Sequence, residues 1–102
     1  MFLENFYQEK FNNEEEVLEK LKKYPYSFFR YEDKWKDNDR IALYAIEKYS
    51  FNYKYISKRL KNNINIIYKV LHLNPFIFTS IPKEFRDNKD LCMIAVESSG
   101  FN

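Results

Sequence analysis

The chain has 102 residues, of which 45% are apolar and 20% aromatic, and it carries a formal net charge of +2. That composition supplies a core for one domain over residues 1–102, while one glycine and three prolines exclude a flexible linker and a turn-rich all-β fold. The single cysteine excludes an internal disulfide and fits a reducing compartment.

The N-terminal stretch lacks the basic region and apolar run of a signal peptide. The longest apolar run, residues 91–96, is far too short to cross a bilayer. We therefore expect a cytoplasmic protein that makes no contact with a membrane, and a monomer is the expected state.

In chain order, the first expected elements are a short helix over residues 2–9 and a long helix over residues 13–24. Glutamates 14–16 open the long helix and lysines 20, 22 and 23 close it, which matches the helix dipole. The pattern returns every 25 residues and predicts further long helices over residues 38–49, 63–73 and 88–98.

Each long helix begins at asparagine or aspartate, which are preferred N-caps because the side-chain oxygen accepts a free backbone N–H. Two adjacent columns carry them: Asn13, Asn38, Asn63 and Asn88, and one position earlier Asn12, Asp37, Asn62 and Asp87. Glu15 fits the partner position of a capping box counted from Asn12. Apolar residues follow at spacings of three and four, so one stripe of each helix is predicted to be buried.

Stop signals recur in the same register, and an aromatic residue follows each one. The stops are Pro25, Ser50, Pro75 and Gly100, and the aromatics are Tyr26, Phe51, Phe76 and Phe101. Short helices are predicted after the stops, over residues 26–33, 51–58 and 76–81. The predicted fold is therefore all-α, a short solenoid-like stack of four repeats of about 25 residues, each a long helix plus a short helix.

Residues suited to catalysis or metal binding are sparse. One histidine and one cysteine cannot build a His/Cys metal site within a chain. His72 shares its column with charged residues, and Cys92 shares its column with Val17, Ala42 and Ile67, so we expect an exposed imidazole and a buried thiol. We expect no catalytic residue, no metal, no cofactor and no enzymatic activity.

Basic residues also recur in register, near the point where a short helix ends and a long helix begins. The candidate partner-binding residues of this basic ladder are Lys36, Lys58, Lys61, Lys83 and Arg86. A basic strip suits an acidic protein surface or nucleic acid. The simpler interpretation is that bases favour the C-terminal ends of helices, and Asp37, Asp39, Asp87 and Asp90 would repel phosphate.

The segments Lys36-Asp37-Asn38-Asp39-Arg40-Ile41-Ala42 and Phe85-Arg86-Asp87-Asn88-Lys89-Asp90-Leu91 carry a resemblance, as does Leu60-Lys61-Asn62-Asn63. They resemble the units of a bacterial tandem helical repeat family that is catalogued as a domain of unknown function. The similarity is clear over residues 35–102 and weak in the first unit. It implies an all-helical stack and no catalytic residue.

The expected function is that of a non-enzymatic protein-interaction module, because extended repeat surfaces suit protein binding. A small inhibitor of a larger enzyme, of the anti-CRISPR kind, is the form of this role that the chain's size suggests. The alternative is a nucleic-acid-binding protein that uses the basic ladder. An enzyme is the least favoured of the three classes.

Overall fold

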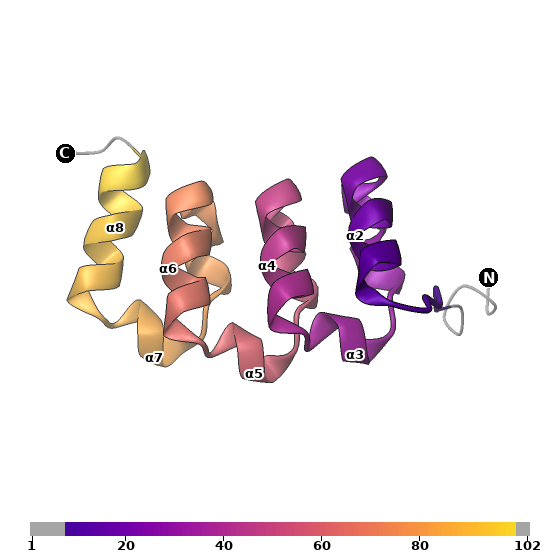
Figure 1. Ribbon diagram of the computed structural model, residues 1–102. Helices are drawn as coiled ribbons and strands as arrows, with labels where there is room; N and C mark the ends of the chain where they lie inside the picture. Colours follow the sequence, from indigo (N-terminus) through magenta and orange to yellow (C-terminus); the bar gives the residue numbers. More distant parts are fainter. Residues whose placement is uncertain (1–7, 100–102) are drawn as a thin grey trace, which may run out of the picture.

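The computed structural model describes residues 8–99, with side chains through residue 97. Four long helices stand side by side in Figure 1, and each begins 25 residues after the previous one. Their bounds are α2 Glu14–Lys23, α4 Asp39–Lys48, α6 Ile64–Leu73 and α8 Lys89–Ser99. The described chain contains no strand, so the prediction of an all-α fold is confirmed.

The segments between the long helices each form two elements, not one short helix as predicted. A 3₁₀-helix comes first: η1 Pro25–Arg30, η2 Ser50–Tyr55 and η3 Pro75–Ser80. One turn of α-helix follows: α3 Asp33–Lys36, α5 Lys58–Lys61 and α7 Lys83–Arg86. Two residues of extended backbone, such as Ile56 and Ser57, separate them and break the predicted short helix.

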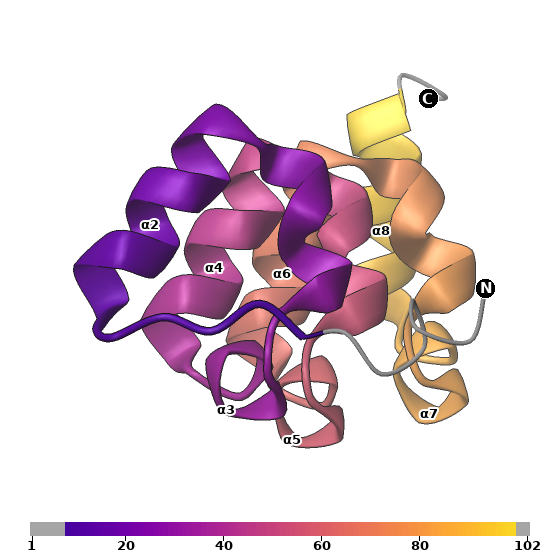
Figure 2. The same ribbon diagram turned by 90° about the vertical axis from the view of Figure 1, so that its right-hand side faces the viewer.

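Figure 2 looks along the stack and shows three parallel rows. The long helices form one row, the 3₁₀-helices a second, and the one-turn helices line the lower edge. Before α2, Glu9 forms an isolated bridge with Tyr31, and Phe11 packs edge-on against the Tyr31 ring at 4.8 Å. Most of the short helix predicted over residues 2–9 lies outside the described residues, and residues 8 and 9 are not helical.

Of the two predicted columns of N-caps, the one that begins with Asn13 caps all four long helices. The side chains of Asn13, Asn38, Asn63 and Asn88 each accept a backbone N–H of the first turn. The capping-box prediction for Glu15 is wrong, because Asn13 is the true cap and Glu16 is the residue three positions beyond it. The Glu16 carboxylate accepts the N–H of Asn12, one residue before the cap, at 2.8 Å.

The core consists of apolar columns that repeat in the 25-residue register. The residues Val17, Ala42 and Ile67 are fully buried, because each is covered by the next unit of the stack. Cys92 stands in the same column but is only partly buried, contrary to the prediction. Among the described residues no long helix follows α8, so one side of Cys92 lacks that cover, and its thiol donates to the Arg86 carbonyl at 3.2 Å.

Polar contacts join successive units along the rows. The Arg40 guanidinium donates to Glu14 at 3.0 Å, and Asn38 donates to the same carboxylate at 2.8 Å. These bonds lower the pKa of Glu14, with the Asn38 bond the larger cause. One unit further on, the Asn74 amide donates to the Ser50 hydroxyl at 2.9 Å, so the register is fixed by specific contacts as well as by apolar packing.

Candidate interaction surface

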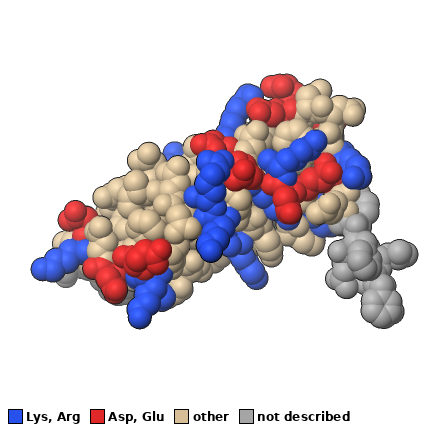
Figure 3. Space-filling view, turned by 90° about the horizontal axis from the view of Figure 1, so that it is seen from below, with Lys and Arg blue, Asp and Glu red and all other residues tan. Residues whose placement is uncertain are grey.

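The basic ladder lies on the edge formed by the one-turn helices. Lys36 ends α3, Lys58 and Lys61 are the first and last residues of α5, and Lys83 and Arg86 are the first and last residues of α7. Stacking therefore brings the five residues to one edge, as the sequence predicted. Figure 3 views this edge and shows blue and red side chains interspersed, with no continuous basic strip.

Three members of the ladder are partly withdrawn from solvent. The Lys36 ammonium donates to the Phe29 carbonyl at 2.7 Å, and burial lowers the pKa of this amine. The Nε atom of Arg86 is buried and has no hydrogen-bond partner among the described residues. Lys58 and Lys83 are exposed, and Lys61 is half-buried. Of the five predicted residues, only Lys58 and Lys83 are thus fully presented to a partner.

Neighbouring acidic residues offset the charge of this edge. Arg59 on α5 donates to the carboxylates of Asp37 at 3.0 Å and Asp39 at 2.8 Å. Ser57 also donates to Asp37 at 2.6 Å, and these bonds, with that from Ser57 the larger cause, lower the pKa of Asp37. Asp37 therefore stays ionised and opposes the approach of phosphate.

A different surface, the row of 3₁₀-helices, presents aromatic side chains to solvent. In a 3₁₀-helix, residues three apart lie on the same side. Phe28 and Tyr31 consequently face the core together, while Tyr26 and Phe29 face outward together. The same position in each helix is outward: Tyr26 is 68% exposed, Phe51 47% and Phe76 76%. Aromatics at these exposures are unusual for a surface without a partner.

Ring contacts join the outward face of η1 to that of η2. Tyr26 meets Tyr49 edge to face with ring centroids 4.5 Å apart, and Tyr49 meets Phe51 at 5.6 Å. A second contact joins Phe29 of η1 to Tyr55 of η2 at 6.0 Å. These contacts hold the rings in place on the stack. We call this surface, with its six residues Tyr26, Phe29, Tyr49, Phe51, Tyr55 and Phe76, the aromatic face.

Cations lie over several of these rings. The Arg30 guanidinium lies over the Phe29 ring at 5.4 Å, and the Lys54 ammonium lies over the Tyr55 ring at 5.6 Å. At the first corner of the stack, Lys20 lies over the Tyr24 ring at 5.2 Å and pairs with Glu9 at 3.2 Å. The aromatic face is therefore cationic, and the three 3₁₀-helices contain no Asp or Glu.

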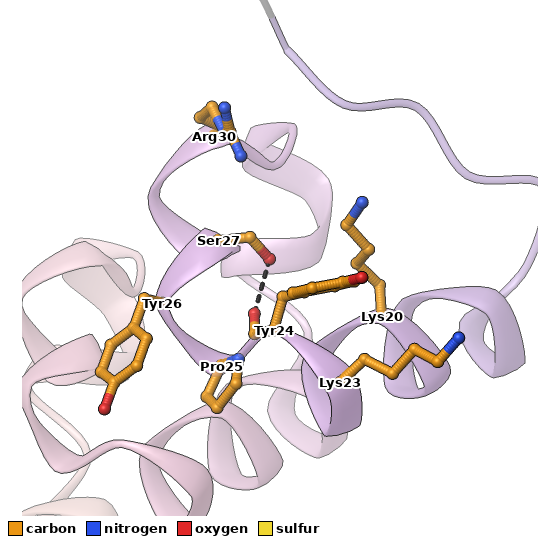
Figure 4. Close-up of a pocket in the computed structure, with 7 residues that line it drawn as sticks. All are labelled: Lys20, Lys23, Tyr24, Pro25, Tyr26, Ser27 and Arg30. Atoms are coloured by element: carbon orange, nitrogen blue, oxygen red, sulfur yellow. Dashed lines mark hydrogen bonds between the residues drawn. The ribbon is translucent and has the colours of Figure 1, made fainter.

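A hollow of about 600 Å³ lies at the corner between α2 and η1. Figure 4 shows the residues that line it. Its lysines, Lys20 and Lys23, lie with Tyr24 on one side of η1, whereas Tyr26 points to the other side. Ser27 donates to the Tyr24 carbonyl at 2.7 Å and so serves the backbone of the turn. The lining side chains do not converge on one point, which makes this hollow a poor site for a small molecule.

A smaller hollow, of about 270 Å³, lies between η2 and η3 within the aromatic face. It is lined by Tyr49, Phe51, Lys54, Tyr55, Ile77 and Ser80. Its volume falls below the range of about 300–1,000 Å³ that small-molecule pockets occupy. An inserted side chain of a partner is a better match to this size than a cofactor.

The residues weighed for catalysis lie apart from the aromatic face. His72 is exposed, as predicted, and its Nδ1 contacts the Tyr68 carbonyl at 2.7 Å. Over residues 8–99, no three His, Cys, Asp or Glu side chains gather closely enough to hold a metal ion. None of the helices in that range combines the length and the apolar character that a membrane span requires.

Sequence reasoning missed the aromatic face, although the signal was present. It used the aromatic residue after each stop only as a register marker, and it predicted one short helix for the segment that follows. The helix predicted over residues 76–81 ended before Pro82, but those over residues 26–33 and 51–58 ran through the break that Ile81-Pro82 marks, because a residue before proline is driven to extended backbone. With the break placed there, the segment before it fits the three-residue period that separates Phe28 and Tyr31 from Tyr26 and Phe29.

The repeated long helices, 3₁₀-helices and one-turn helices define an all-α helical-repeat protein. The chain belongs to the family described as Domain of unknown function (DUF4116), whose model matches residues 13–61, 38–86 and 63–102. Successive matches begin 25 residues apart, in the register of the long helices. No curated protein and no solved structure matches the chain.

Proposed function

We propose that this chain is a non-enzymatic protein-interaction module that binds its partner through the aromatic face. The observation that carries the proposal is the row of outward rings on successive 3₁₀-helices, each repeated in the same register. Buried aromatic anchors dominate the energetics of protein interfaces. Rings held by their neighbours also lose little conformational entropy on binding.

The alternative function, nucleic-acid binding through the basic ladder, has weaker support. Arg59 is engaged by two aspartates, and Lys36 is engaged by a backbone carbonyl. An edge with interspersed acids gives little of the counterion release that drives binding to phosphate. Inhibition of a larger enzyme stays a prediction that identification of the partner would decide.

The experiment compares three immobilised proteins in a nuclease-treated extract of the source cell. These are the wild type, the double variant Tyr26→Ala/Phe76→Ala, and Met93→Ala. Met93 is the matched control, because it is 55% exposed but lies on α8 and outside the aromatic face. All substituted side chains are largely exposed, so the variants should keep the fold, which circular dichroism checks.

We expect a protein retained by the wild type and by Met93→Ala to be lost from the double variant. Truncation of two anchors should cost about 2 kcal/mol or more of binding free energy. Equal retention by all three proteins would refute binding through the aromatic face. A partner that disappears only on nuclease treatment would favour the nucleic-acid alternative.

A further inference from the structure

The aromatic face lies in a long acid-free part of the chain. Residues 48–83 contain no Asp or Glu, and neither do residues 20–31. All three 3₁₀-helices fall within these stretches, so their own charges are those of Arg30 and Lys54. The one-turn helices differ in this respect, because α3 contains Asp33, α7 contains Glu84, and Arg59 of α5 meets Asp37 and Asp39. A partner that bears carboxylates meets attraction on the aromatic face and mixed charges on the edge below.

Four side chains form a continuous group across η1 and η2. The Arg30 guanidinium covers Phe29, the Phe29 ring contacts Tyr55, and the Lys54 ammonium covers Tyr55. The successive distances are 5.4, 6.0 and 5.6 Å. This arrangement places a positive charge at each end of a two-ring platform. It suits a segment that is apolar at its centre and acidic on both sides.

The hollow between η2 and η3 adjoins this platform, because Lys54 and Tyr55 line both. Its other aromatic walls, Tyr49 and Phe51, are fixed by their mutual contact at 5.6 Å, and Ile77 closes it toward the core. At about 270 Å³ it has room for one large apolar side chain. Lys54 at its rim lies where a carboxylate next to such a side chain would pass.

Nucleic acid also combines negative charge with flat apolar groups, but the ring geometry disfavours it. Single-stranded nucleic acid binds by stacking its bases on open aromatic faces. Here cations cover the faces of Phe29 and Tyr55, and Tyr26 meets Tyr49 edge to face at an interplanar angle of 73°. The arrangement offers charged rims and a side-chain hollow and lacks a ladder of open ring faces.

We infer that the occupant of the aromatic face is an acidic protein segment that inserts one leucine or aromatic side chain into the hollow between η2 and η3. Lys54 binds a carboxylate beside the inserted side chain. This inference rests on the proposed function and names the chemistry of its partner.

The test uses fluorescence anisotropy with short labelled probes of defined chemistry. The main probe is a Glu-rich peptide with one central Trp. Matched probes replace every Glu by Gln, or the Trp by Ala, and oligo(dT) represents nucleic acid. The proteins are the wild type, Lys54→Glu and the control Lys83→Glu. Lys83→Glu makes the same charge change at an exposed position on α7, away from the aromatic face.

We expect the Glu/Trp probe to bind most tightly, and each matched probe to lose about tenfold in affinity. Lys54→Glu should lose about tenfold for the main probe, whereas Lys83→Glu should change it by less than about twofold. The inference is overturned if the Gln probe binds as well as the Glu probe or if both variants lose affinity equally. Tighter binding of oligo(dT), reduced by Lys54→Glu, would overturn it in favour of nucleic acid.

Failure of this inference can be separated from failure of the proposed function. The cellular partner is tested for retention by Lys54→Glu and for displacement by the Glu/Trp peptide. If binding of the partner requires Tyr26 and Phe76 but is unaffected by Lys54→Glu and by the peptide, the proposed function stands and only the acidic segment is refuted. If binding does not require the two rings, the proposed function and the acidic segment are both refuted.

Discussion

The side-chain amide of Asn52 donates a hydrogen bond to the backbone carbonyl of Pro25, at 3.0 Å across 27 residues of sequence. The same amide donates to the Ala45 carbonyl at 2.9 Å, and the Asn52 side chain is almost completely buried. One amide thus satisfies the carbonyl that opens η1 and a carbonyl in the last turn of α4. This bond holds η1 and η2, the supports of the aromatic face, in register.

Asn52→Ala should therefore lower the free energy of unfolding by more than the small change in side-chain volume would. The Pro25 carbonyl would lose this donor, and the Ala45 carbonyl would keep only the Tyr49 N–H, so we expect a loss of about 1–3 kcal/mol of unfolding free energy. Urea denaturation measures the change. Asn62→Ala is the control, because Asn62 also donates to a carbonyl, that of Lys58 at 2.8 Å, but is exposed. Similar losses for both would show that the Asn52 bridge contributes little.

A second prediction concerns the core column that contains Ile67. This side chain is fully buried on α6, so Ile67→Asp places a charge where it finds no partner. We expect a loss of more than about 4 kcal/mol, close to the whole stability of a small domain. Ile67→Val removes one methylene and should cost about 0.5–1.5 kcal/mol. Thermal unfolding followed by circular dichroism gives both values, and an Ile67→Asp protein that melts near wild type would contradict the assigned burial.

The sequence was sufficient for the long helices, because an asparagine cap, an apolar stripe and a stop recur together and each has a local physical cause. It was insufficient for the elements between them. In those elements, whether a side chain faces the core or the solvent depends on whether the backbone follows a three-residue or a 3.6-residue period. The pattern Phe28-Phe29-Arg30-Tyr31 fits both periods. Only packing against the long helices buries Phe28 and exposes Phe29.

The candidate site was predictable in part for the same reason. The register brings Lys36, Lys58, Lys61, Lys83 and Arg86 to one edge, as their spacing indicated. Spacing cannot show that Lys36 turns to the Phe29 carbonyl or that Arg59 meets Asp37, since both contacts join residues from different elements. These tertiary contacts engage part of the basic ladder, which favours the aromatic face as the interaction surface.

Alkaline pH should unfold the protein through a buried phenol. Burial raises the pKa of Tyr31 to about 12, although its bond to Ser27 acts in the opposite direction. Burial also raises the pKa of Tyr53, whose hydroxyl donates to the Lys61 carbonyl at 2.7 Å. In the unfolded chain a tyrosine loses its proton near pH 10. Between about pH 10 and 12 the folded state thus binds more protons, and stability falls as pH rises.

The measurement is urea denaturation at a series of pH values, with tyrosinate absorbance recorded in parallel. Tyr31→Phe removes the ionisable group and should flatten the alkaline decline, at the cost of the bond between Ser27 and the Tyr31 hydroxyl at 2.9 Å. Tyr26→Phe is the control, because Tyr26 is largely exposed and its removal should leave the slope unchanged. Equal slopes in all three proteins would contradict the role given to Tyr31.

The last prediction separates the aromatic face from the basic ladder by titration with nucleic acid. A protein that neutralises phosphates releases counterions, so its affinity falls with salt by a slope of about 0.7–0.9 per phosphate contacted. Because the net charge is only +2 and aspartates interrupt the ladder, we expect weak, non-specific binding at most at physiological salt. Titrations against single- and double-stranded DNA and RNA at two salt concentrations test this.

The informative variant is Lys58→Glu/Lys83→Glu, since Lys36 and Arg86 are partly buried and reversing their charges would disturb the fold. If the wild type binds nucleic acid tightly and this variant does not, the aromatic face cannot be the only binding surface. The charges that the variant reverses lie on the one-turn helices, outside that face.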